Sequence, residues 1–162
     1  MSTENEKYAG THLSMLWPVL CVLVLVACEP GPQEIRISEQ ECDHCRMMIS
    51  DERFASQMVT RQGRQYAFDA IECMAAFVDG AEGRQHDIHS LWVPDFKDSE
   101  GWIPAEEARY LQSENLRSPM ALNFTAYKTE EDAIQQESVV SGTVMDWNEL
   151  RSIVQEAWLN GQ

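Results

Sequence analysis

Short alternations of apolar and polar residues run through the body of the chain, and they predict several strands. A hairpin fits the two runs on either side of Gln62 and Gly63, where glycine favours a tight turn. The strands expected in this half of the body are 34–38, 55–61, 64–68 and one that ends at Pro94.

A helix is expected between the hairpin and the strand that ends at Pro94. Ile71, Met74 and Phe77 recur there at helical spacing. Asp69 is the candidate N-cap of this helix, and Gly80 marks its expected end.

The second half of the body repeats the same order of elements. EARYLQS and MALNFTAY predict strands, KTEEDAIQQE predicts a helix capped by Thr129, and VVSGTVM predicts a further strand. An apolar stripe from Trp147 to Trp158 predicts a closing amphipathic helix. Because strands and helices are mixed without regular βαβ units, we expect an α+β fold with two ββαβ-like halves and a C-terminal amphipathic helix.

The N-terminal region has a different pattern. An uncharged apolar run extends from Leu13 to Ala27, shorter than the roughly 20 residues that span a membrane but suited to a signal peptide. It ends in LVAC, which resembles the lipobox of bacterial lipoproteins, and the Pro/Gly-rich EPGPQE follows. The resemblance implies cleavage before Cys28 and lipid on Cys28, with an uncleaved signal anchor as the alternative. The expected organisation is a signal peptide (1–27), a lipidated tether (28–37) and a domain (38–162).

The charge of the chain restricts its partners. Twelve Lys and Arg residues against 27 Asp and Glu residues give a net charge of −15, which argues against nucleic-acid binding because phosphates require basic surfaces. The same charge suits an exported protein or one with a cationic partner. Glu29 follows Cys28 in place of the aspartate commonly linked with inner-membrane retention. We therefore expect a lipid-anchored protein on the periplasmic face of the cell envelope, with the outer membrane favoured.

Three cysteines remain once Cys21 is cleaved off and Cys28 is lipidated: Cys42, Cys45 and Cys73. An odd number in an oxidising compartment does not make a simple disulfide framework, so at least one thiol is available as a ligand or redox group.

The Cys-x-x-Cys pair alone leaves several interpretations open. A redox dithiol would place Cys42 and Cys45 at the start of a helix, for which the following residues are poor. A zinc site needs a fourth ligand beside the cysteines. A disulfide between Cys42 and Cys45, with methionines as core filler, is a purely structural alternative. The histidines considered as zinc ligands are His44, His86 and His89, of which the last two are interpreted as surface residues.

A fourth interpretation is a site for Cu(I). Thiolate and thioether are soft donors, which Cu(I) prefers. Cys45 and Met47 lie two residues apart, so in an extended loop both sulfurs point to the same side, whereas Met48 faces away. The further sulfur candidates are Cys73 and Met74 in ECMAAF and Met120 in SPMALNF.

The order of these motifs resembles the NosL family, lipoprotein copper chaperones associated with nitrous oxide reductase. The motifs that carry the resemblance are CDHCRMMI, YAFDAIECMAAF, GWIPAEEARYLQSENLRSPMALNFTAY and TEEDAIQQE followed by SGTVMDWNEL. They span nearly all of the body of the chain, in the order that the family keeps. One departure is Arg46, where many members have glycine, and the segment after Met120 is poorer in glycine than is usual.

The resemblance implies a function and a ligand set. It implies an α+β body of two ββαβ-like halves, no enzymatic activity, and Cu(I) bound by Cys45 and Met47 with Met120 as a third donor. It leaves Cys42, Cys73 and Met74 as possible additional metal or redox residues. It also implies delivery of copper to nitrous oxide reductase through its ABC-type assembly machinery. An envelope thiol-disulfide oxidoreductase using Cys42 and Cys45, or a zinc-stabilised binding lipoprotein, is the alternative function.

Overall fold

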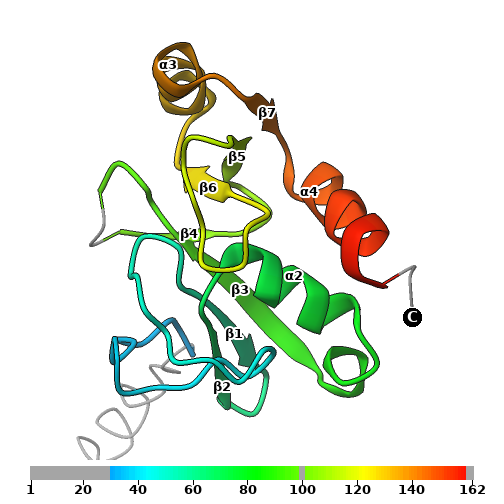
Figure 1. The fold of residues 1–162 in the computed structure, drawn as a ribbon. Helices are drawn as coiled ribbons and strands as arrows, with labels where there is room; N and C mark the ends of the chain where they lie inside the picture. The colour runs from blue at the N-terminus through cyan, green and yellow to red at the C-terminus, as the bar shows by residue number, and fades with distance from the viewer. Residues whose placement is uncertain (1–29, 99–100, 160–162) are drawn as a thin grey trace, which may run out of the picture.

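Two antiparallel sheets form the frame of the molecule, with helices packed on them (Figure 1). The computed structural model describes residues 30–98 and 101–159. The first sheet has the order β2-β1-β3-β4 and the second has the order β6-β5-β7. The strands are β1 (Ser56–Thr60), β2 (Gln65–Phe68), β3 (Ile88–Pro94), β4 (Trp102–Pro104), β5 (Arg109–Gln112), β6 (Phe124–Tyr127) and β7 (Thr143–Met145).

The helices complete two units of the same topology. They are α2 (Ile71–Asp79), the 3-10 turn η2 (Gly83–Gln85), α3 (Glu130–Val140), α4 (Trp147–Val154) and the π-helical turn η3 (Gln155–Leu159). In both units a hairpin is followed by a helix and a third strand, which returns to pair antiparallel with the first strand of the hairpin. The expected α+β fold with two ββαβ-like halves and a C-terminal helix is confirmed, and β4 is an added edge strand.

One hydrophobic core joins the two units. α2 packs on the first sheet with Ile71, Met74 and Phe77 buried. α4 lies along α2 and contributes Trp147 and Leu150 to the same cluster (Figure 1). Because the apolar stripe of α4 packs against α2, the C-terminal helix stabilises the contact between the two units.

The hairpin of the first unit forms as expected. Met58 pairs with Tyr66, and the Thr60 amide donates to the Arg64 carbonyl at 2.9 Å. Gly63 has a φ of 81°, a left-handed conformation that glycine adopts without steric cost. This turn chemistry is what made the hairpin visible in the sequence.

Two expectations near the start of the domain are wrong. Residues 34–38 do not form a strand, because Ser38 turns at a φ of 62° and the Glu39 amide donates back to the Arg36 carbonyl at 3.2 Å. Asp69 is not the N-cap of α2, since Ala70 occupies that position. The Asp69 carboxylate is instead buried and accepts hydrogen bonds from the Ser50 amide, at 2.8 Å, and from the Ser50 hydroxyl.

Strand boundaries in the second unit differ from the expected ones. β6 begins at Phe124, because Ala121 and Asn123 have positive φ values of 65° and 63° that interrupt an extended run from Met120. β7 begins at Thr143, because Val140 still belongs to α3. The expected helix ends agree better: Thr129 caps α3.

The N-terminal signals lie outside the described residues. These are the signal peptide expected over 1–27 and the lipidation site at Cys28. Within the residues that the structure does describe, no helix combines the length and apolar character needed to cross a membrane. From Gly31 onward the chain lies against the first sheet, where the Gln57 side chain exchanges hydrogen bonds with the backbone of Gln33.

Candidate metal centre

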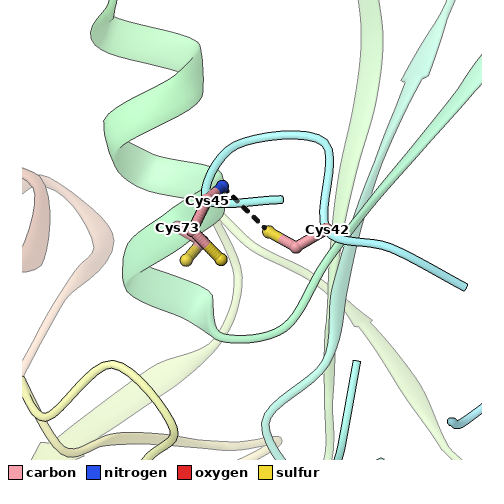
Figure 2. A group of neighbouring side chains, drawn as sticks. All are labelled: Cys42, Cys45 and Cys73. Atoms are coloured by element: carbon pink, nitrogen blue, oxygen red, sulfur yellow. Dashed lines mark hydrogen bonds between the residues drawn. The ribbon is translucent and has the colours of Figure 1, made fainter. Parts of the chain in front are cut away.

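Three thiols from two separate segments of the sequence meet at one point (Figure 2). The sulfur atoms of Cys42, Cys45 and Cys73 all lie within 4.8 Å of one another. Cys42 and Cys45 belong to the loop before β1, whereas Cys73 lies in the first turn of α2 (Figure 2). All three are free cysteines, so the alternative of a disulfide between Cys42 and Cys45 is not seen among the residues described.

The cysteine loop is a tight turn closed by its own backbone. The Cys42 amide donates to the Met47 carbonyl at 2.8 Å, and the Arg46 amide donates to the Cys42 carbonyl at 3.0 Å. Arg46 has a φ of 63°, in the left-handed region that favours glycine. The glycine that many members of the resembled family carry at this position suits this backbone geometry.

Hydrogen bonds attach the loop to the end of β2 and to the start of α2. The backbone amide of Asp43 donates to the Ala67 carbonyl at 2.9 Å, and the Asp43 carboxylate accepts from the Ala67 amide at 2.8 Å. Asp69 holds Ser50 on the other side of the loop. Because Cys73 follows shortly after Asp69, these contacts set the position of the loop thiols relative to Cys73.

The three thiols have different proton affinities. The Cys73 thiol donates a hydrogen bond to the Cys42 sulfur, and backbone amides around the turn also point at the Cys42 sulfur. Together these contacts lower the pKa of Cys42 to about 5. The same hydrogen bond, with burial, raises the pKa of Cys73. Burial raises the pKa of Cys45. These shifts favour the thiolate form at Cys42 and the thiol form at Cys45 and Cys73.

Met47 and Met48 lie at the surface next to this cluster. Their exposed fractions are nearly equal, 48% and 47%. The backbone amide of Met47 points at the Cys45 sulfur and counteracts the rise in the pKa of Cys45. Met48 forms an isolated antiparallel bridge with Glu41. Exposure alone does not separate the two methionines, and their expected roles stay predictions.

Met120 lies in a loop that is tied to α2. The loop is closed by reciprocal hydrogen bonds between Ser118 and Asn123, each amide donating to the other side chain at 3.1 and 3.0 Å. The buried carboxylate of Glu72 accepts hydrogen bonds from the Ser118 hydroxyl and from the Leu122 amide, so it holds residues on both sides of Met120. Met120 itself is partly buried against the same core cluster as Cys45.

The remaining sequence candidates occupy other surroundings. Met74 is fully buried in the core. His44 is exposed, with its ring stacked on Trp158 at 6.3 Å between centroids. His86 is partly buried, with a ring nitrogen 3.0 Å from the Tyr66 hydroxyl, whereas His89 is exposed. Within the described part of the chain the group of potential ligands at this site contains cysteines and no histidine.

Two buried carboxylates lie beside the thiols in roles that the sequence did not indicate. Asp69 and Glu72 flank the start of α2, and each has one oxygen, Oδ2 and Oε2, that is buried without a hydrogen-bond partner. Burial raises the pKa of Glu72. An acidic residue at the start of a helix is ordinarily explained as a favourable partner of the helix dipole, so no sequence signal pointed to these contacts.

The geometry suits a soft metal ion. A metal–sulfur bond of about 2.3 Å places three sulfurs of a trigonal site about 4 Å apart. Three sulfurs already within 4.8 Å need only small adjustments to reach that arrangement. Thiolate donors select ions such as Cu(I) and zinc over hard ions.

Comparison with known proteins gives the family of this chain. Its fold is similar to that of the crystal structure of the copper chaperone NosL from Shewanella denitrificans, with a TM-score of 0.62 and 19% sequence identity over 74% of this chain and 96% of that chain. A search of curated proteins found no match. A model of the NosL family matches residues 34–154, which is most of the sequence, and the chain therefore belongs to the NosL family.

Proposed function

We propose that this protein is a copper chaperone that binds Cu(I) through sulfur and transfers it to a partner without catalysing a reaction. The observation that carries the proposal is the meeting of three thiols within 4.8 Å in a member of the NosL family. The solved structure that shares this fold is itself described as a copper chaperone.

The proposed binding residues are Cys45 and Met47, with Met120 as the third donor. Cys45 is the least buried of the three clustered thiols, and Met47 is half-exposed beside it. Cu(I) accepts few ligands and prefers sulfur. A site with few ligands allows an incoming sulfur to bind before an old one leaves, so the ion can pass between proteins without being released into solution.

The local structure argues against the two alternative functions. A redox dithiol is activated by a lowered thiol pKa at a helix N-terminus. Cys42 and Cys45 lie instead in a turn. The thiol with the lowered pKa, Cys42, is fully buried, whereas burial raises the pKa of Cys45, the more exposed of the two. A structural zinc site uses four ligands, and the group found in the described residues contains three.

The proposed setting is the periplasmic face of the cell envelope, with lipid on Cys28 as the membrane anchor and the outer membrane favoured. The support is the lipobox-like end of the apolar run before Cys28. The proposed recipient is nitrous oxide reductase, reached through its ABC-type assembly machinery. The support for this recipient is membership of the NosL family, and the acidic charge argues against a nucleic-acid partner.

An anaerobic titration of Cu(I) against a strong chromogenic chelator tests the proposal. The reduced protein should bind one Cu(I), and Cys45→Ser, Met47→Ala and Met120→Ala should each weaken binding. The loss of the Cys45 thiolate should cost at least the roughly 10–100-fold in affinity that loss of a ligand's hydrogen-bond partner costs, and the loss of either thioether, a weaker donor, should cost less. If all three variants bind Cu(I) like the parent protein, the site lies elsewhere and the proposed ligands are wrong.

Met47→Ala also separates the chaperone from an oxidoreductase. A thioether takes no part in thiol-disulfide exchange, so an oxidoreductase would keep its exchange rate with glutathione in this variant. A chaperone would lose Cu(I) affinity. Unchanged Cu(I) binding together with rapid exchange through Cys42 and Cys45 would favour the oxidoreductase.

A further inference from the structure

The residues that carry the sulfur atoms around Cys45 differ in solvent exposure, from fully buried to half-exposed. Cys42 and Cys73 are fully buried, each with an exposed fraction of 0%. Cys45 is partly buried, and Met47 is 48% exposed. Cys45 is therefore the one thiol of the cluster that touches both the buried sulfurs and the surface.

The buried sulfurs belong to segments that packing and hydrogen bonds hold in place. Cys73 is in the first turn of α2, which is buried along most of its length. Cys42 is in a loop that is hydrogen-bonded to β2 through Asp43. Such surroundings hold ligands in place and exclude water, which suits retention of an ion.

The exposed sulfurs have the opposite properties. Met47 projects into solvent from a turn that contains a strained residue, Arg46. Met120 is only partly buried, in a loop with two residues of positive φ. A thioether is an uncharged and weaker donor than a thiolate, so an ion held here exchanges more readily with a partner.

We propose that Cu(I) occupies two positions that share Cys45: an inner position completed by Cys42 and Cys73, and an outer position completed by Met47 and Met120. This inference rests on the proposed function, because it divides the proposed copper site into a storage position and a transfer position. Cys45 stays bound in both, and the ion moves outward by exchanging buried thiolates for thioethers.

The exchange balances without a change in oxidation state. Moving inward, Cu(I) breaks its bonds to the Met47 and Met120 sulfurs and forms bonds to the Cys42 and Cys73 sulfurs. Cys73 gives up its thiol proton to solvent when it binds as a thiolate. The outward step reverses each bond change, takes that proton back and leaves copper as Cu(I).

The experiment compares Cys73→Ala with Met47→Ala in two measurements on the reduced protein. One is the affinity for Cu(I), and the other is the rate at which Cu(I) passes to a chromogenic chelator in a stopped-flow mixer. Without the inner position, Cys73→Ala should weaken binding by about 10-fold or more and speed release. Without the outer position, Met47→Ala should weaken binding less than Cys73→Ala does and should slow release.

Matched controls separate this result from general damage. Met48→Ala removes a methionine of nearly equal exposure, 47%, and should change neither measurement. Cys42→Ser removes a second inner ligand and should behave like Cys73→Ala, which covers the case in which Cys73→Ala does not fold. X-ray absorption at the copper edge should show three sulfur donors in the parent protein and a change of sulfur distances in both inner variants.

The opposite signs of the two release rates are the decisive outcome. If both variants speed release, copper sits in a single position that includes all these sulfurs, and the inference is overturned. It is overturned equally if Cys73→Ala and Cys42→Ser both match the parent protein. If the parent protein binds no Cu(I), or Cys45→Ser binds as well as the parent, it is the proposed function that fails.

Discussion

Arg46 occupies a backbone conformation that costs an L-residue free energy. Its φ of 63° lies in the left-handed region, where a side chain with a Cβ is strained by about 1–2 kcal/mol. The turn nevertheless closes, because hydrogen bonds on both sides fix the backbone of Cys42 and Met47. The strain lies between the two proposed copper ligands Cys45 and Met47.

Replacing Arg46 by glycine should therefore stabilise the protein. Arg46→Gly relieves the strain but adds conformational entropy to the unfolded chain, so we expect a net gain of up to about 1 kcal/mol in the free energy of unfolding. Urea denaturation measures this gain. Arg46→Ala is the control, since it removes the guanidinium and keeps the strained Cβ. An equal gain in Arg46→Ala would show that the charge, and not the backbone, is responsible.

Cys42 should make the stability of the metal-free protein depend on pH. Its pKa is lowered from 9.0 to about 5 in the folded state, so between these values the folded state holds one proton fewer at this thiol than the unfolded chain. Stability should therefore rise with pH across this window and be lost as pH falls toward 5. The raised pKa of Cys73 acts in the opposite direction above pH 9.

Thiolate absorbance in the ultraviolet checks this assignment directly. In the reduced, metal-free protein one thiolate should persist as the pH is lowered to about 5. Cys42→Ser should lose that signal and should flatten the dependence of urea denaturation on pH. Cys45→Ser should retain the signal. Retention of it in Cys42→Ser would place the thiolate on another cysteine.

At the scale of elements, the contact between α2 and the loop of Met120 links two of the three segments that carry the candidate ligands. Glu72 is next to Cys73 on α2 and holds Ser118 and Leu122 on either side of Met120. Glu72→Ala would leave a buried hydroxyl and a backbone amide without their acceptor, a loss of about 1–3 kcal/mol in stability. The same change frees the Met120 loop from α2.

Glu72→Ala should consequently weaken Cu(I) binding through Met120. A double-mutant cycle with Met120→Ala tests this, since Glu72→Ala should have little further effect on affinity once the thioether is gone. Glu72→Gln keeps an acceptor oxygen at the same place and should bind Cu(I) more tightly than Glu72→Ala. If the effects of Glu72→Ala and Met120→Ala on affinity simply add, the loop is not positioned by this contact.

Local patterns predicted the elements better than the contacts between them. The hairpin around Gly63 and the cap at Thr129 were visible because their signals lie within a few residues. The strand expected at 34–38 failed because the turn at Ser38 is stabilised by Ile49, whose carbonyl accepts from the Ser38 amide at 2.8 Å. No alternation of apolar residues reports a turn that is held by a distant backbone group.

For the candidate site, too, local spacing was visible in the sequence and tertiary contacts were not. The pair Cys45 and Met47 could be proposed from its spacing in an expected extended loop, although the structure shows a tight turn there, with Arg46 at a positive φ. The meeting of Cys42 with Cys73 depends on how α2 packs beside the loop, and the roles of Asp69 and Glu72 depend on burial. Sequence analysis could name Cys73 as a candidate, but only the tertiary structure places it at the cluster.

At the scale of the whole molecule, the net charge of −15 should govern the encounter with a partner. If the recipient presents a cationic face, transfer of Cu(I) should slow as salt is added, because ions screen such attraction. Neutralising two exposed acids beside the cysteine loop, with Glu39→Gln and Glu41→Gln, should reduce this salt dependence. Stopped-flow transfer to the purified recipient at several ionic strengths measures it.

A control variant on another surface, with one acid neutralised in place of two, tests whether the effect is local. Glu131 is exposed on α3, which packs on the second sheet (Figure 1). Glu131→Gln changes the net charge without changing the surroundings of the cysteines, and it should leave the salt dependence nearly as it was. Transfer rates that respond equally to salt in all of these variants would argue against docking through the acids of this loop.

The proposed ligands come from three segments: the loop of Cys42 to Met47, the start of α2 and the loop of Met120. An ion in either proposed position joins the cysteine loop to one of the other two segments, so it would act as a cross-link that the unfolded chain cannot keep intact. Copper binding should then add a stabilisation free energy that grows with the logarithm of the ratio of free copper to the dissociation constant. The melting temperature should rise accordingly. The protein would become more rigid when Cu(I) binds and more flexible once Cu(I) has dissociated. A recipient could therefore distinguish the copper-bound form by its rigidity as well as by its metal.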